Sequence, residues 1–96
     1  MRRDDALNRL RALKPSFTEM NIRRLALFGS TARDEAGSES DVDLLIEFDK
    51  RPAGLVELAR RKREFEEYLG CAVDLVTFAG VQKPHHLHIL EEAIDV

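Results

Sequence analysis

Apolar residues recur three or four positions apart in three parts of the chain, which is the spacing of one face of an amphipathic helix. This spacing predicts helices over residues 4–13, 55–69 and 84–94. Pro15 ends the first helix because its ring removes a backbone donor, and Gly70 suits the end of the second. The apolar positions are Leu7, Leu10 and Leu13, then Leu55, Leu58, Ala59, Phe65 and Leu69, then Leu87, Leu90 and either Ala93 or Ile94.

Three shorter apolar runs, bounded by glycine or polar residues, predict β-strands. They cover residues 22–28, 41–48 and 71–78, and a short helix over residues 30–36 is expected after the first of them. The second run alternates, which places its side chains on two opposite faces of the strand. One face carries Val42, Leu44, Ile46 and Phe48, and the other carries Asp41, Asp43, Leu45 and Glu47.

The predicted elements follow the order helix, strand, helix, strand, helix, strand, helix. This order favours an α/β or α+β two-layer fold in which helices cover a small three-stranded sheet, although it does not fix the strand order. A chain of 96 residues has room for one modest core, so we expect residues 1–96 to form a single domain.

Composition narrows the class of protein. Apolar residues make up 44% of the chain and charged residues 34%, as in soluble globular proteins, and no apolar run approaches the roughly 20 residues of a membrane span. The first residues show no export signal, and the single cysteine, Cys71, cannot form an internal disulfide, so a reducing cytoplasm is expected. A net charge of -3 argues against sequence-independent nucleic-acid binding.

Three features of the helical segments each have two explanations. The basic run over residues 60–63 is either a solvated helix face, paired with nearby glutamates, or a contact surface for an anionic partner. His85, His86 and His88 are either solvated residues beside a helix start or part of a metal site. The apolar side of residues 87–94 either packs on the sheet or forms a docking face for a partner.

Three aspartates on the predicted strands are the clearest candidates for chemistry. Asp41 and Asp43 stand two positions apart, so their side chains project from the same face and can share divalent cations, although both could also be ordinary solvent-facing residues. Asp74 interrupts an apolar strand, where a buried charge needs either an arginine or a metal ion as its partner. Two metal ions held by such carboxylates would suit phosphoryl chemistry.

A glycine and a serine directly after the first strand form a candidate anion site. Gly29 lets the backbone approach a ligand closely, and Ser30 stands at the predicted helix start, where N–H donors favour a triphosphate. The alternative is a strand-to-helix turn capped by the Ser30 hydroxyl. Arg33 either clamps a phosphate oxygen or pairs with Asp34, Glu35 or another carboxylate.

Together these residues resemble the signature of the DNA polymerase beta-type nucleotidyltransferase superfamily. Ten residues separate Ser30 from Asp41, and Asp34 is one departure, because relatives usually show glycine there and an added negative charge could weaken nucleotide binding. Within the superfamily, nearly the whole chain is similar to the minimal nucleotidyltransferases, short cytoplasmic domains often paired with HEPN-domain toxins. The matching segments are Leu27-Phe28-Gly29-Ser30-Thr31-Ala32-Arg33 and Asp41-Val42-Asp43-Leu44-Leu45.

The resemblance implies a small mixed sheet covered by helices and a magnesium-dependent transfer of AMP from ATP. Gly29 and Ser30 would hold the triphosphate, and Asp41 and Asp43 would bind two Mg²⁺ ions. Asp74 would complete one metal site and help activate the attacking hydroxyl, either as a ligand or as a general base. The acceptor would be a tyrosine of a HEPN toxin, so the chain would be an antitoxin and pyrophosphate would be released.

Two other functions remain compatible with the sequence. A non-catalytic module could neutralise a toxin simply by covering it, in which case the three aspartates would be dispensable. Alternatively, a nucleotidyltransferase of this type could modify a small molecule or a nucleic-acid end, in which case a non-protein acceptor would be labelled.

Overall fold

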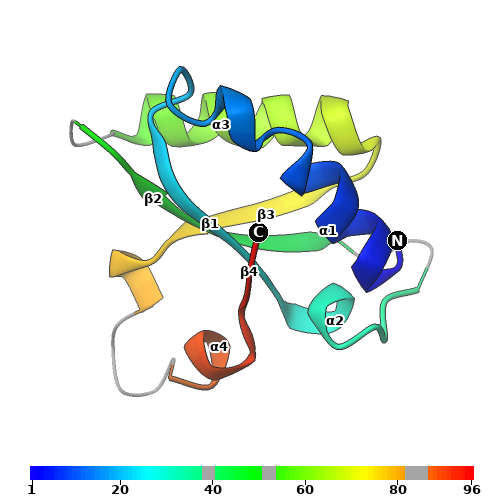
Figure 1. Ribbon diagram of the computed structural model, residues 1–96. Helices are drawn as coiled ribbons and strands as arrows, with labels where there is room; N and C mark the ends of the chain where they lie inside the picture. The colour runs from blue at the N-terminus through cyan, green and yellow to red at the C-terminus, as the bar shows by residue number, and fades with distance from the viewer. Residues whose placement is uncertain (38–40, 51–53, 82–86) are drawn as a thin grey trace.

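The computed structural model describes residues 1–37, 41–50, 54–81 and 87–96. Helices and strands alternate along these residues in the order expected from the apolar pattern, with two short 3₁₀ turns and one further strand added (Figure 1). The elements are α1 (Arg3–Arg11), η1 (Lys14–Ser16), β1 (Ile22–Phe28), α2 (Gly29–Ala32), β2 (Val42–Phe48), α3 (Leu55–Leu69), β3 (Val73–Thr77), η2 (Ala79–Val81), α4 (Leu87–Glu92) and β4 (Ile94–Asp95).

The sheet is mixed and its strands follow the order β3-β2-β1-β4. β1 pairs antiparallel with β2 and with β4, whereas β2 and β3 are parallel. The expected mixed α/β architecture is confirmed, but the expectation of three strands is wrong, because Ile94 leaves the last helix and pairs with Leu27. Two residues at the end of an amphipathic segment carry too little pattern to distinguish a helix turn from a short edge strand.

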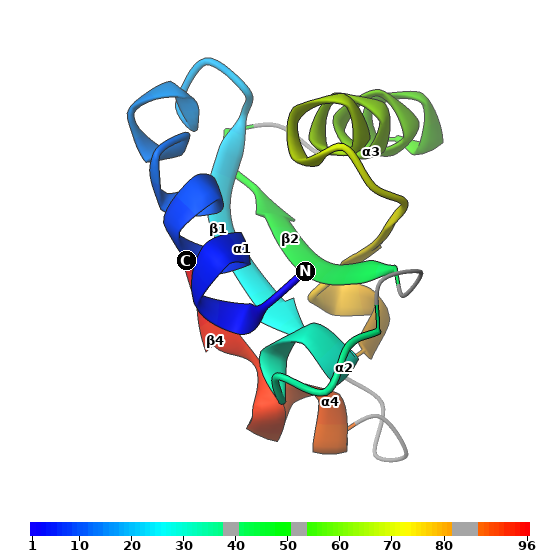
Figure 2. The same cartoon turned by 90° about the vertical axis from the view of Figure 1, so that its right-hand side faces the viewer.

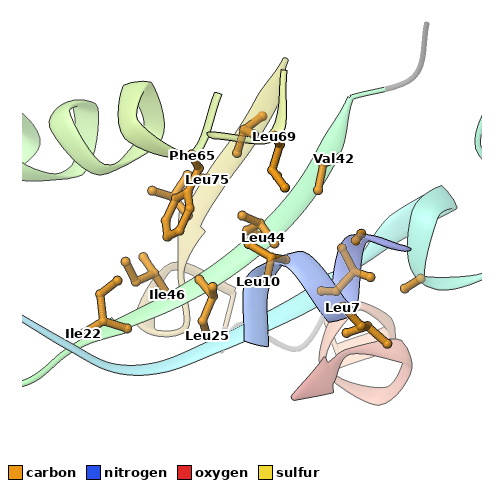
Figure 3. Close-up of a cluster of buried hydrophobic side chains, with 14 of the residues drawn as sticks. Leu7, Leu10, Ile22, Leu25, Val42, Leu44, Ile46, Phe65, Leu69 and Leu75 are labelled. Carbon is orange, nitrogen blue, oxygen red and sulfur yellow. The ribbon is translucent and has the colours of Figure 1, made fainter. Parts of the chain in front are cut away.

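One face of the sheet packs against α1 and α3 and holds the larger part of the core (Figure 1). The alternation of β2 sends Val42, Leu44 and Ile46 to this face, and all three are completely buried. They meet the apolar side of α1 at Leu10 and that of α3 at Phe65 (Figure 3). The predicted apolar face of α1 is therefore the face that the sheet covers. For α3 the prediction holds at Phe65 and Leu69 but is wrong at Leu55 and Ala59, which are exposed because the first turns of the helix extend past the core.

The opposite face of the sheet is also packed, by η2 and α4, and we call this packing the second-face cluster. Leu45, which shares its side of β2 with acidic residues, is completely buried there because apolar residues of β1 and the end of the chain surround it. The buried members of the second-face cluster are Ala26, Phe28, Leu45, Phe78 and Val81, and the half-buried residues packed against them are Val76, Ile89, Leu90 and Ala93.

Of the two explanations for the apolar side of the last helix, packing on the sheet accounts for most of its residues. Ile89, Leu90 and Ala93 lie against the second-face cluster, so only Leu87, which is half exposed, remains for a docking face among the described residues. Pro84, His85 and His86 lie outside the described residues, so the predicted helix start and the histidine cluster are not tested there.

Two further expectations about side chains are met in part. Cys71 is half-buried and packs against the core, as a small apolar residue would. Within the basic run, Arg61 is buried rather than solvated and pairs with Glu57 and Glu64 on its own helix. Its neighbours in the run are exposed. No helix among the residues that the structure describes is long and apolar enough to cross a membrane.

Candidate active site

The candidate aspartates come together at one end of the sheet because of the strand register. In the parallel pair of β2 and β3, Asp43 lies directly opposite Asp74. On its other side Asp43 is opposite Phe28, the last residue of β1, so Gly29 follows immediately beside it. Three segments that are far apart in the sequence therefore meet around the side chain of Asp43.

Both aspartates belong to the second face of the sheet. Leu45 follows Asp43 by two positions and Val76 follows Asp74 by two, and both apolar residues lie in or against the second-face cluster. The acidic site therefore borders the layer formed by η2 and α4. It lies on the opposite face from the core that α1 and α3 cover.

Asp43 is the most perturbed acid of the site. Partial burial raises the pKa of its carboxyl above the ordinary value, and the negative charges of Asp74 and Asp41 raise it further. Arg33 lowers the same pKa and Glu92 raises it, which shows that both side chains lie within electrostatic reach. Asp43 therefore lies among other carboxylates whose charges oppose its ionisation.

Asp41 and Asp74 are exposed. The expectation that Asp74 would need a partner for a buried charge is wrong, because β3 is the edge strand of the sheet and the side chain reaches water. Among the described residues no arginine forms an ion pair with Asp74, so the structural alternative for this residue finds no support there. Asp41 precedes β2 by one residue instead of opening it.

Position 29 requires glycine because of its backbone conformation and because the Asp43 side chain lies against it. Its backbone is left-handed, with φ of 74°. A methyl group built on its Cα would overlap the Asp43 carboxylate and would stand 2.9 Å from the Asp43 Cγ. Any side chain at position 29 would therefore displace the central acid of the site as well as strain the turn.

Ser30 is the second residue of α2 rather than its cap. No side chain caps this helix, and the Ser30 carbonyl accepts a hydrogen bond from the Glu35 N–H at 2.8 Å. The helix is shorter than the predicted span of residues 30–36, because Asp34 adopts a left-handed backbone with φ of 58°. The result is a tight turn that holds Gly29, Ser30 and Arg33 beside the acidic cluster.

Glu92 is a site residue that the sequence did not single out. One of its oxygens, Oε1, accepts a hydrogen bond from the Gly29 backbone N–H at 3.2 Å. The other, Oε2, accepts one from Arg33 Nη1 at 2.9 Å. Figure 2 shows α2 beside α4, the arrangement that allows both contacts. The only sequence signal was an acidic residue at the end of an amphipathic helix, which is common on any helix.

Arg33 pairs with carboxylates, which was one of the two roles expected for it from the sequence. Glu35 and then Glu92 raise the pKa of its guanidinium above the usual value through hydrogen bonds. The Glu35 contact joins Nε to Oε2 at 3.1 Å. Arg33 is about half exposed and remains the cation that faces the acidic cluster.

Asp34 is directed away from the cluster. Its carboxylate pairs with Arg2 at 2.8 Å and accepts the backbone N–H of Arg3, the first residue of α1, at 3.1 Å. These contacts, the Arg3 N–H first, hold the pKa of Asp34 below its ordinary value. The charge of Asp34, which was expected to weaken nucleotide binding, is therefore compensated by Arg2 and stabilises the start of α1.

A pocket of about 420 Å³ opens beside Asp74. Apart from Asp74 and Thr77 its walls are glycine and apolar side chains, contributed by β1, β3, η2, α4 and the nearby face of α3. The lining residues are Phe28, Leu58, Asp74, Leu75, Val76, Thr77, Gly80, Val81 and Ile89. A second pocket, of about 430 Å³ at the start of α3, shares none of these residues and includes no acid of the site.

The donor set fits hard divalent cations better than any other ligand class. Carboxylate oxygens are the preferred ligands of Mg²⁺, and a cation bound here would offset the burial and the neighbouring charges that raise the pKa of Asp43. Within the described part of the chain, no group of three or more carboxylate, histidine or cysteine side chains is arranged to hold a metal ion. A metal would therefore have to draw flexible side chains together.

Comparison with known proteins supports the same class. The family model described as a nucleotidyltransferase domain matches residues 8–96. A Methanocaldococcus jannaschii protein whose name marks it as a candidate protein adenylyltransferase is 38% identical over 86 residues, covering 90% of this chain and 91% of that one. The protein adenylyltransferase MntA of Thermococcus cleftensis is 33% identical over 75 residues, covering 78% of this chain and 75% of that one.

Solved structures agree. One described as a minimal nucleotidyltransferase superposes with a TM-score of 0.81 at 33% identity, covering 100% of this chain and 97% of that one. A toxin–antitoxin structure with AMP-PNP superposes with a TM-score of 0.66 at 16% identity, over 99% of this chain and 72% of that one, which shows a shared fold.

A mixed sheet that gathers aspartates beside a glycine turn is thus the arrangement of a nucleotidyl-transferring enzyme. The chain belongs to the nucleotidyltransferase family and, within it, to the minimal nucleotidyltransferases.

Proposed function

We propose that this enzyme transfers AMP from ATP to a tyrosine hydroxyl of a HEPN-type toxin and thereby acts as its antitoxin. The observation that carries the proposal is the register that places Asp43 beside Asp74 and beside the Gly29 turn. Relatives at 38% and 33% identity are named protein adenylyltransferases, and the Thermococcus cleftensis one carries the name MntA. The structure with AMP-PNP is described as a toxin–antitoxin complex, which supports the same kind of partner.

In this proposal the acidic side of the site holds the metal. Asp41, Asp43 and Asp74 would hold two Mg²⁺ ions, which when bound neutralise the carboxylates and stabilise negative charge on the transferred phosphoryl group. The raised pKa of Asp43 supports this assignment, because the same charge cluster that repels itself would favour a bound cation.

The turn after β1 would hold the triphosphate. The Gly29 N–H and the Arg33 guanidinium are donors on the same side of the acidic cluster, and Ser30 lies between them in the chain. Because Gly29 lacks a side chain, the Asp43 carboxylate lies directly against the turn, so a metal ion held by Asp43 would be next to a phosphate bound there. The donors would orient the α-phosphate toward the acceptor and leave the β- and γ-phosphates as the departing group.

Asp74 would then help to activate the hydroxyl of the acceptor. It is exposed at the edge of the sheet, within the lining of the 420 Å³ pocket. An aromatic ring in this apolar pocket would place its hydroxyl near the Asp74 carboxylate, which would accept the proton as the oxygen attacks the α-phosphorus. The bond from the acceptor oxygen to the α-phosphorus forms, the bond to the bridging oxygen breaks, and pyrophosphate leaves.

The test is label transfer. Purified protein is incubated with Mg²⁺, α-labelled ATP and host extract, and labelled protein is separated by size. We expect one labelled band with the wild type and with Asp4→Asn, a surface aspartate that pairs with Arg3, and none with Asp43→Asn. Transfer that survives in Asp43→Asn would contradict the proposal.

The same assay separates the two other functions. Labelling of a nucleic acid or a small molecule instead of a protein would identify a different acceptor. No labelling together with toxin neutralisation that survives Asp43→Asn would indicate a binding module that does not use its acidic site.

A further inference from the structure

Glu92 engages both donors of the turn with a single carboxylate. Its two oxygens divide between the Gly29 N–H, at 3.2 Å, and the Arg33 guanidinium, at 2.9 Å. These two groups come from the start and the end of one short turn, and Glu92 comes from the far end of the chain. The side chain of Glu92 is only about a quarter exposed, so it lies in the site and not on an open surface.

The position of Glu92 is electrostatically costly apart from these two contacts. Its negative charge lies near enough to Asp43 to raise the pKa of that carboxyl, so it adds to the repulsion within the acidic cluster. A side chain that only needed to be solvated would turn toward water, as that of its neighbour Glu91 does. Glu92 stays because the backbone N–H and Arg33 are an anion-binding pair.

A carboxylate and a phosphate present the same feature to such donors, namely two negatively charged oxygens close together. The contacts that Glu92 makes are therefore those that a phosphate group would make with Gly29 and Arg33. Both ligands cannot use the same N–H groups at the same time.

We propose that Glu92 is a built-in competitor of the triphosphate, whose carboxylate must leave Gly29 and Arg33 before the nucleotide binds. The inference rests on the proposed function, because it is there that these two donors take the triphosphate. It assigns Glu92 a role in setting nucleotide affinity and in rejecting weaker anions. A triphosphate could bind the metal ions and the turn together, whereas orthophosphate would have only the turn to bind, so the carboxylate excludes the smaller anion more effectively.

The fold permits this exchange without unfolding α4. Leu90 packs on the second-face cluster, and Ile94 pairs with Leu27 in the sheet, so the backbone is fixed on both sides of Glu92. The side chain itself rotates about three bonds. Displacement therefore requires only a new rotamer for Glu92, which swings its carboxylate from the turn toward water.

The experiment measures binding of ATP and of inorganic triphosphate by calorimetry with Mg²⁺ present. Glu92→Gln keeps the size of the side chain but removes its charge, and we expect both ligands to bind about tenfold more tightly, the worth of one charge-assisted hydrogen bond. Glu91→Gln, on the exposed neighbour in the same helix, should bind like the wild type. Glu92→Asp, too short to bridge both donors, should also bind more tightly, which checks the result in a second variant.

Each outcome of the binding measurement either supports or overturns the competition by Glu92. Unchanged or weaker binding in both Glu92 variants would overturn the inference, and weaker binding would show that Glu92 positions Arg33 for the nucleotide instead of competing with it. Absence of any binding in all proteins would overturn it as well. The proposed function fails separately: if Glu92→Gln binds inorganic triphosphate more tightly while no protein is labelled, the competition stands and the AMP transfer does not.

Discussion

Asp43 is a residue of the candidate active site whose charge lowers the stability of the folded protein. Its pKa is raised in the folded protein, so the folded state binds its proton more tightly than the unfolded state does. The charged form is therefore disfavoured by folding, and the resulting loss of stability is present above the raised pKa and disappears as the pH falls through it.

We expect Asp43→Asn to raise the thermal unfolding midpoint at pH 7, in the absence of divalent metal, because the variant removes a charge from a repelling cluster. The gain over the wild type should shrink as the pH is lowered through the carboxyl range, where Asp43 becomes neutral by itself. Calorimetric scans at several pH values with a chelator present would measure it. A lower midpoint for Asp43→Asn at pH 7 would show that Asp43 makes a stabilising contact and would contradict this account.

Gly29→Ala tests the close approach between the turn and Asp43. We expect a loss of about 2 kcal/mol in unfolding free energy, since a left-handed backbone and an overlap with the Asp43 carboxylate act together, and a loss of AMP transfer. Gly54→Ala is the matched control, because φ there is -84° and an added methyl group meets nothing within 4 Å. Denaturant titration measures both, and equal stability of the two variants would refute the argument.

At the scale of the residue, local signals in the sequence explain most of the site but not all of it. Asp41, Asp43 and Gly29 were predictable, because alternation and a strand end place them on one edge. The environment of Asp74 was not predictable, since burial depends on whether its strand is central or at the edge. Glu92 was hidden for the same reason: its contacts depend on where the end of the chain folds back.

At the scale of the element, long periodic segments were predictable and short ones were not. The 15-residue helix α3 ends where Gly70 adopts a left-handed backbone, as its pattern predicted. The four-residue helix α2 and the two-residue strand β4 differ from prediction, because tertiary contacts decide segments this short. Leu45 shares its side of β2 with Asp43 and Glu47, which favoured a solvent-exposed face. Leu45 is buried instead, because the second-face cluster covers it.

The pocket formed by β3, η2 and α4 allows a test at this scale. Val76 is half-buried and lines the pocket, so Val76→Trp should fill it. We expect transfer to the protein acceptor to fall at least tenfold while ATP binding stays unchanged, because the pocket is assigned to the acceptor. Val56→Trp, in the pocket at the start of α3, is the control for an added indole. Weaker ATP binding in Val76→Trp would assign the pocket to the adenine base instead.

At the scale of the whole molecule, the strands gather acids that are far apart in the sequence, and the fold carries that repulsion in its overall stability. A ligand that neutralises the cluster and binds only the folded state adds to the stability of the entire chain. Mg²⁺ should therefore act as a stabiliser of the fold and not only as an aid to the chemistry.

We expect Mg²⁺ at ten times its dissociation constant to add about 1.4 kcal/mol to the unfolding free energy. For a domain of this size the thermal midpoint should rise by several degrees, since 1 kcal/mol corresponds to roughly 4 to 8 °C. The rise should be absent in Asp43→Asn, reversed by a chelator, and preserved in Asp4→Asn. If Mg²⁺ shifted the midpoint of Asp43→Asn as much as that of the wild type, its binding would lie elsewhere, and the acidic end of the sheet would lose its assignment as the metal site.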